Sequence, residues 1–192
     1  MRLALRKQQA RAGDITRLFA DESEALTHPY LARAWAKRGA DLRVPAPGQS
    51  RKIAMLGALD CITRTLVMET SHTKKSADFI ALLRRLDHLF GSRPGVATKP
   101  VVLVLDNGPI HKSRASLAAL AERAHWLIVE WLPKYAPELN DIERSWASLK
   151  TNHLAHQTFA SQDALETAIH RALEALNQRS KVIALANQRI HA

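Results

Sequence analysis

The chain has 192 residues, of which 46% are hydrophobic and 24% charged, a composition typical of one globular domain with a real core. Lys and Arg number 28 against 18 Asp and Glu, giving a formal net charge of +10, and this balance favours a polyanionic partner, most often nucleic acid. The single cysteine, Cys61, excludes an internal disulfide and a cysteine-based zinc cluster and fits a reducing cytoplasm. No apolar run of about 18 residues is present to span a membrane.

The first quarter of the chain contains a basic arm, a strand and an insertion. Residues 1–14 form the arm, MRLALRKQQARAGD, which lacks the apolar core of a secretory signal; we expect a short helix or a tail, either solvated or in contact with DNA. Residues 15–192 are predicted to form one domain. Its first strand covers residues 15–21 and ends at Asp21. Residues 27–50, rich in Pro, Gly and Arg, are predicted to be an insertion with only a short helix at 31–37 and a strand at 42–44.

The remaining elements alternate between strands and helices. Residues 52–60 and 64–70 are predicted to pair as an antiparallel hairpin because their link is short. Further strands are expected at 101–105, a continuous aliphatic run, and at 127–131. Helices are predicted from an N-cap at Ser76 to about residue 90, over 113–123, from Glu143 onward, from a cap at Ser161 to about residue 176, and over 181–190. This order predicts an α/β fold with a mixed five-stranded sheet flanked by helices.

Three carboxylates stand at the ends or beginnings of separate elements. Asp21 ends the first strand, Asp106 follows the aliphatic run VVLVL, and Glu143 opens a helix. Mg²⁺ and Mn²⁺ prefer oxygen ligands, and carboxylates from several elements can hold two such ions side by side. The pattern therefore predicts two-metal chemistry on phosphodiesters. Glu22 and Glu24 are rivals of Asp21, although strand alternation points Glu22 to the opposite face.

Two motifs carry a family resemblance: DNGPIH, residues 106–111, and LPKYAPELNDIERSWASLK, residues 132–150. Together they resemble the catalytic core of the DDE transposases, in particular the mariner-type bacterial insertion-sequence enzymes. The resemblance implies an RNase H-like fold, with Asp21, Asp106 and Glu143 as catalytic residues that bind two Mg²⁺ or Mn²⁺ ions. It also implies DNA as partner, at element ends and target, a homodimer in the active complex, and a cytoplasmic, nucleoid-associated protein in a bacterium.

The chain departs from the family pattern in two places. Asp141 stands where these enzymes usually have Pro, and an acid near a helix N-terminus is also favourable there. Only a short segment precedes the first strand, whereas such transposases carry a helix-turn-helix region that reads the element ends. We therefore expect the catalytic part alone. Two rival functions are a nuclease of the same fold that does not join strands, and a truncated or co-opted copy that binds DNA and regulates.

Five further residues are candidates for DNA contact, each with a structural alternative. His111 either lies near the scissile phosphate or holds the loop after Asp106 by a hydrogen bond. Lys150 follows Glu143 by two helical turns and either contacts phosphate or is solvated. Trp35 lies among basic residues that include Arg51 and Lys52, an arrangement suited to DNA; the alternative is a small hydrophobic cluster around the indole.

Overall fold

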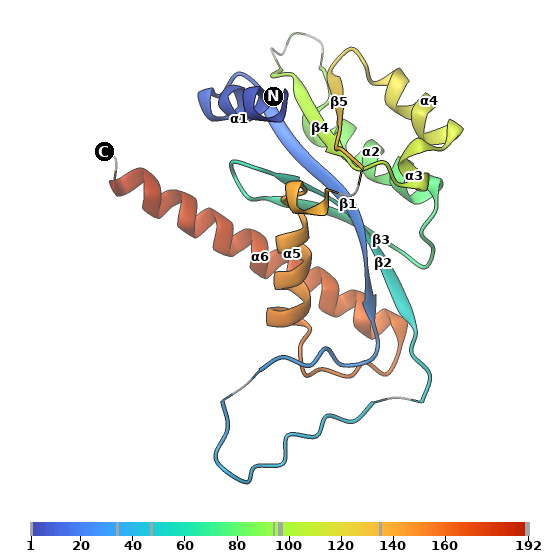
Figure 1. Cartoon of the computed structure of the whole chain (residues 1–192), viewed down its shortest axis with the longest axis vertical. Helices are drawn as coiled ribbons and strands as arrows, with labels where there is room; N and C mark the ends of the chain where they lie inside the picture. The colour runs from blue at the N-terminus through green and yellow to red at the C-terminus, as the bar shows by residue number, and fades with distance from the viewer. Residues whose placement is uncertain are drawn as a thin grey trace.

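The computed structural model describes residues 2–33, 35–46, 48–93, 95, 98–134 and 136–190, and for residues 137 and 182–190 it describes the backbone alone. A five-stranded sheet forms the centre (Figure 1). Its strands are β1 (Thr16–Leu26), β2 (Lys52–Asp60), β3 (Leu66–Ser71), β4 (Val101–Leu105) and β5 (Leu127–Trp131), in the spatial order β3-β2-β1-β4-β5. β2 pairs antiparallel with β1 and β3, and β4 pairs parallel with β1 and β5. The predicted mixed five-stranded sheet is confirmed.

Helices cover both faces of this sheet (Figure 1). One face carries α2 (Ser76–Phe90), α3 (Pro109–Lys112) and α4 (Arg114–Glu122); the other carries α5 (Glu143–Ser148), the π-helical turn η2 (Leu149–His153) and α6 (Gln162–Ile190). The helix α1 (Arg2–Ala12) lies beside the start of β1, and a 3₁₀ turn, η1 (Pro137–Leu139), leads toward α5. No helix in the described ranges is both long and apolar enough to cross a membrane.

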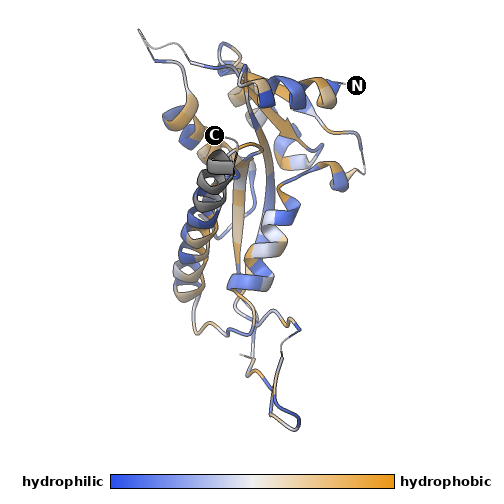
Figure 2. Ribbon diagram, turned by 90° about the vertical axis from the view of Figure 1, so that its left-hand side faces the viewer, coloured by the Kyte–Doolittle hydropathy of each residue, from blue (hydrophilic) through white to orange (hydrophobic). Residues whose placement is uncertain are grey.

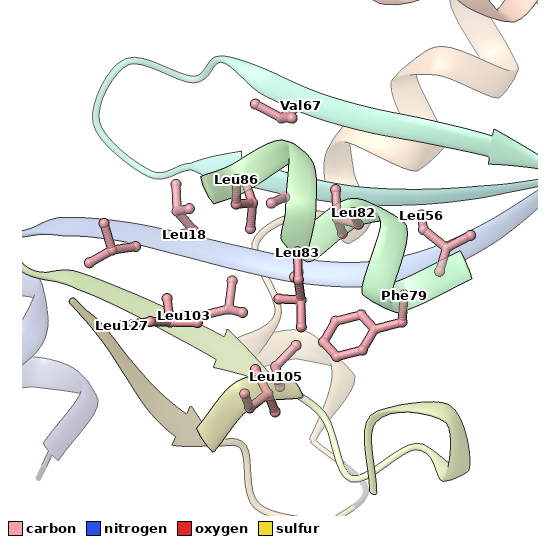
Figure 3. Packing of buried hydrophobic residues seen from close by; sticks show 14 of the residues in the cluster. Leu18, Leu56, Val67, Phe79, Leu82, Leu83, Leu86, Leu103, Leu105 and Leu127 are labelled. Carbon is pink, nitrogen blue, oxygen red and sulfur yellow. The ribbon is translucent and has the colours of Figure 1, made fainter. Parts of the chain in front are cut away.

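Two hydrophobic layers follow from the alternation of side chains along the strands. On β1, Leu18 packs toward α2 while its neighbour Phe19 packs toward α5 and α6. Figure 3 shows the first layer, in which Phe79, Leu83 and Leu86 of α2 lie on the sheet. Burial of each such side chain stabilises the fold by about 1.5–3 kcal/mol. Figure 2 shows the strands as mainly hydrophobic and the covering helices as mixed, consistent with one buried face per helix.

The strands β1 and β4 separate at the point where the sheet changes from parallel to antiparallel. Their pairing runs from Thr16 opposite Val101 to Phe19 opposite Val104, and then stops. β1 continues to Leu26, paired with β2. The chain leaving β4 is therefore free to turn away beside the middle of β1. Residues at the carboxyl end of β4 face that part of β1, which is where ligands bind in open sheets of this kind.

The segment between β1 and β2 is closed at its base and extends away from the sheet (Figure 1). The amide of Thr27 donates to the carbonyl oxygen of Arg51 at 2.9 Å, and the amide of Arg51 donates to the Thr27 hydroxyl at 3.0 Å. The predictions of a helix at 31–37 and a strand at 42–44 were wrong, since the described residues of both ranges are neither helical nor extended in a ladder. Their apolar side chains, Leu31, Trp35 and Leu42, are exposed, so no packing is available to stabilise a short helix.

Other predicted boundaries need correction. β1 runs five residues beyond Asp21, which therefore lies inside the strand and not at its end. β3 begins at Leu66, and Ser76 is the first helical residue of α2, preceded by Lys75 as the N-cap. Ser161 does cap α6, accepting a hydrogen bond from the Ala164 amide at 3.1 Å. However, α6 is one helix of 29 residues, because no Gly or Pro interrupts the range assigned to two helices.

Candidate active site

A glycine in β2 brings α5 close to the middle of β1. Gly57 is the ladder partner of Asp21. A Cβ atom at Gly57 would lie 2.7 Å from Cη2 of Trp146, so only glycine allows the indole to pack against the strand here. Trp146 lies three residues after Glu143, the first residue of α5. The contact between Gly57 and Trp146 therefore places Glu143 on the side of the sheet that carries Asp21.

The three predicted carboxylates line one cavity of about 430 Å³. Asp21 comes from β1, Asp106 from the residue after β4, and Glu143 from the start of α5. The other lining residues belong to the two connections that follow β4 and β5: Asn107, Gly108, Leu132, Pro133, Lys134, Ala136 and Asn140. Three elements far apart in the sequence thus present acids to one space at the carboxyl end of β4.

Asp106 is held by two hydrogen bonds on one carboxylate oxygen. The amide of Gly108 donates to Oδ1 at 2.9 Å, and Nδ1 of His111 lies 2.6 Å from the same oxygen. The hydrogen bond from His111 is the main reason that the pKa of Asp106 lies below its ordinary value, and the Gly108 amide adds to this lowering while partial burial opposes it. Asp106 is therefore fixed as a carboxylate, the form that binds cations.

His111 is almost fully buried and lies between two acids. Its side chain is 1% exposed, its ring packs edge-on against Phe79 with centroids 4.6 Å apart, and its Nε2 lies 3.5 Å from Oε2 of Glu22. Glu22 in turn lies 3.6 Å from Nζ of Lys74. This burial contradicts direct DNA contact by His111 in this conformation and favours the alternative role, in which the imidazole holds the loop after Asp106.

Asp21 experiences the combined negative charge of the site. Burial, followed by the charges of Glu22, Glu143 and Asp106, raises the pKa of Asp21 to about 8, although the hydrogen bond from the Glu22 amide at 2.8 Å opposes this. Like charges this close favour either a proton or a bound cation. Glu22 points to the opposite face, toward His111 and Lys74, and Glu24 pairs with Lys52 at 2.9 Å. The geometry therefore favours Asp21 over both rivals as a candidate ligand.

The side chains that line the cavity are chemically suited to bind a divalent cation, although they do not surround a single point. Within the described ranges no three His, Cys, Asp or Glu side chains lie close enough together to ligate a single ion. The lining nevertheless supplies carboxylate oxygens, the preferred ligands of Mg²⁺ and Mn²⁺. It also contains the buried amide oxygen Oδ1 of Asn140, which has no hydrogen-bond partner among the described atoms. A cation in this cavity would neutralise the acids, and the cation or a water bound to it would give the amide oxygen a partner.

Comparison with known proteins identifies the family. The model of the DDE superfamily endonucleases matches residues 16–166, more than three quarters of the chain. The chain belongs to this family. A 39 kDa protein of insertion element IS630 from Shigella sonnei is 34% identical over 131 residues, covering 68% of this chain and 36% of that protein. This DDE endonuclease chain therefore spans about a third of the length of that relative.

Solved structures share the fold of this DDE endonuclease. The catalytic domain of the Mos1 mariner transposase matches with a TM-score of 0.57 and 18% identity, covering 96% of this chain and 88% of that one. The Mos1 paired-end complex with Mn matches with a TM-score of 0.59 and 18% identity, covering 96% and 59%. The fold is thus RNase H-like, as the sequence motifs led us to expect.

The remaining candidates for DNA contact lie outside the cavity of the DDE endonuclease. Lys150 is half-buried in η2, with Nζ 6.0 Å from the ring centroid of Tyr30; burial lowers its pKa, while the charges of Glu143 and Glu24 act in the opposite direction. Trp35 is fully exposed in the extended segment, so the small cluster considered as its alternative role is absent from the described structure. Arg51 and Lys52 lie at the base of that segment, and both are exposed.

Several residues that shape the site were missed in the sequence. The contact of Trp146 with Gly57 was not predicted, although a glycine inside the strand KIAMLGALD is a signal of close approach by another element. The ion pair between Arg64 and Asp141 was also missed; it ties the start of α5 to the β2–β3 turn. Asn107 also shapes the site, because its Nδ2 donates to the carbonyl oxygen of Leu132 at 2.6 Å and so joins the two connections that follow β4 and β5.

Proposed function

We propose that the chain is the catalytic part of a DNA transposase, which cleaves strands at the ends of an insertion sequence and joins them to target DNA. The observation that carries this proposal is the cavity that Asp21, Asp106 and Glu143 line together in a DDE endonuclease. A relative encoded by an insertion element and a shared fold with the Mos1 complex with a left transposon end support it.

Asp21, Asp106 and Glu143 would hold two Mg²⁺ or Mn²⁺ ions. Such ions activate the attacking water or hydroxyl and stabilise the leaving oxygen. Mos1 paired-end complexes with Mn and with Mg support this choice of metals. In this chain, His111 and the Gly108 amide keep Asp106 ionised and oriented. The ion pair of Asp141 with Arg64 and the packing of Trp146 keep Glu143 at the rim of the cavity.

DNA is the proposed partner, and the basic composition of the chain supports this choice. Lys150, beside Glu143, is suited to contact a phosphate near the cleaved bond. Trp35, Arg51 and Lys52 are exposed and suited to contact DNA farther away. We further propose that two copies act together on paired element ends, and that the protein acts on the bacterial chromosome in the cytoplasm.

The test is cleavage and joining by purified protein. The substrate is a plasmid carrying the terminal sequences that flank the gene, incubated with Mg²⁺ or Mn²⁺. Asp106→Asn and Glu143→Gln should each lower the cleavage rate at least about a hundredfold, because a catalytic metal contributes several kcal/mol. Their melting temperatures should stay near that of the wild type. Glu174→Gln, an exposed acid on α6, is the matched control and should retain activity.

The products distinguish the proposal from its alternatives. Strand joining by a pre-cleaved duplex supports a transposase, whereas cleavage without joining would indicate a nuclease. Cleavage by Asp106→Asn at more than about a tenth of the wild-type rate is incompatible with a metal ligand at this position.

A further inference from the structure

A second cavity, of about 460 Å³, lies on the other side of the η1–α5 connection from the carboxylates. Its wall is formed by α1, the start of β1, the β2–β3 turn and the first residues of α5. Apolar side chains such as Leu3, Phe19 and Ile62 contribute part of this lining. Four basic residues also line the cavity and give it positive charge: Lys7, Arg11, Arg17 and Arg144. Neither the sequence motifs nor the carboxylate site accounts for this arrangement.

Arg17 is the feature that calls for a ligand. Its side chain is buried, at 8% exposure, and it lines the cavity. Among the described residues its partners are all neutral: Nε donates to Sγ of Cys61 at 3.3 Å, Nη1 donates to the carbonyl oxygen of Leu3 at 3.3 Å, and the guanidinium lies 5.0 Å from the ring centroid of Phe19. Arginine is rarely buried without an acidic partner, because an uncompensated charge away from water is costly. An anion in the cavity would compensate it.

The other three basic residues increase the positive charge around Arg17. Lys7 and Arg11 project from α1 and Arg144 from α5, all three are exposed, and none forms an ion pair with a described acid. Two acids also line the cavity. Asp141 is already paired with Arg64, which leaves Glu138 as the acid that opposes the four cations. The cavity therefore attracts anions, and its guanidinium groups are suited to phosphate, which they bind through paired hydrogen bonds.

We propose that this cavity binds a phosphate of the DNA backbone that lies within about four nucleotides of the cleaved bond. The inference rests on the proposed function, which places the cleaved bond at Asp21. Arg17 and Asp21 lie on the same face of β1, four residues and roughly 13 Å apart. A DNA strand has a phosphate about every 3.4 Å along the helix axis. A duplex with its cleaved bond at Asp21 therefore has phosphates within about four nucleotides that reach Arg17. The cavity fixes the register of the strand without reading its sequence.

The first test compares two double substitutions that each remove two positive charges. Arg11→Gln with Arg144→Gln alters the cavity, and Arg84→Gln with Arg114→Gln alters exposed positions on α2 and α4, on the opposite face of the sheet. Arg17 is left unchanged because it is buried. Duplex affinity is measured from about 50 to 200 mM salt in EDTA, where cleavage plays no part. The cavity variant should lose about 0.9 from the slope of log affinity against log salt, the value for one lost phosphate contact. The control should keep the wild-type slope; equal losses in both variants would refute the proposal.

The second test uses Cys61, the only cysteine of the chain, as a reporter inside the cavity wall. A saturating duplex should slow alkylation of Cys61 by a maleimide at least about tenfold in the wild type and in the control, but not in the cavity variant. Protection by inorganic phosphate without protection by duplex would identify a site for a small phosphate and overturn the assignment to DNA. Because both measurements are made without metal, DNA protection in a protein that fails to cleave would refute the proposed function alone.

Discussion

Replacing Gly57 by alanine should move α5 and lower the cleavage rate, although none of the three carboxylate residues is substituted. The added Cβ would lie 2.7 Å from Cη2 and 3.0 Å from Cζ2 of Trp146, and 3.1 Å from Cδ1 of Leu66. Carbon atoms in contact are normally about 3.5–4.0 Å apart, so the indole must withdraw by about 1 Å. Overpacking of this kind costs about 1–3 kcal/mol, and the better strand propensity of alanine returns less than about 1 kcal/mol.

We therefore expect Gly57→Ala to lower the free energy of unfolding by about 1–2 kcal/mol, which for a chain of this size corresponds to roughly 2–8 °C in melting temperature. The effect on cleavage should be larger than this stability loss suggests. Glu143 lies one helical turn before Trp146, and a displacement of about 1 Å at a catalytic group can lower the rate about a hundredfold.

A double-mutant cycle with Trp146→Phe isolates the contact. Phenylalanine removes the part of the indole that meets the new Cβ, and the indole nitrogen has no hydrogen-bond partner in the described structure, so no bond is lost. The double variant should be more stable than the sum of the two single effects predicts, by at least about 1 kcal/mol. Urea denaturation of the four proteins gives this coupling energy. Additive effects would show that the indole does not restrict position 57.

Three other outcomes can be measured on the same protein. The pKa of Asp21 is raised from 3.8 to about 8, so between these pH values the folded state holds a proton that the unfolded chain has released. The free energy of unfolding of the metal-free protein should therefore fall as pH rises from about 4 to about 8. Asp21→Asn should reduce that fall, which urea titrations measure. His111→Ala should lower stability by roughly 1–3 kcal/mol, because the buried ring loses its packing against Phe79 and its hydrogen bond to Asp106. It should also weaken Mn²⁺ binding about 10–100-fold; unchanged Mn²⁺ affinity in electron paramagnetic resonance would exclude a role in orienting Asp106. Trp35→Ala should leave the melting temperature unchanged, because the indole is exposed. It should weaken binding of single-stranded DNA by about 1–3 kcal/mol, the value for one base stacked on an aromatic side chain, and fluorescence anisotropy measures this loss.

The sequence predicted the elements whose stability depends on local pattern. β2, β4 and β5 have the expected bounds because their apolar runs are interrupted by charged or turn residues. β1 was predicted five residues too short, since its polar second half, DESEAL, is stabilised by the ladder with β2 and not by burial. Sequence spacing also placed Asp106 and Glu143 at element ends. It could not show that Glu22 lies between His111 and Lys74, because these contacts depend on how β1, α3 and the segment before α2 pack together.

The closed base of the segment between β1 and β2 has an evolutionary consequence. Two backbone-directed hydrogen bonds between Thr27 and Arg51 join its ends, and the five strands of the sheet include none of the residues between them. For a flexible loop, doubling the length costs only about 0.6 kcal/mol of closure entropy. Lineages can therefore lengthen, shorten or exchange this segment while the cavity of acids is preserved. Tyr30 remains part of the core side, because its hydroxyl bonds to Leu26 and Glu24 and its carbonyl oxygen accepts from the His156 amide. Chimaeras that exchange residues 31–50 between relatives and keep Tyr30 should therefore fold with their catalytic centre intact.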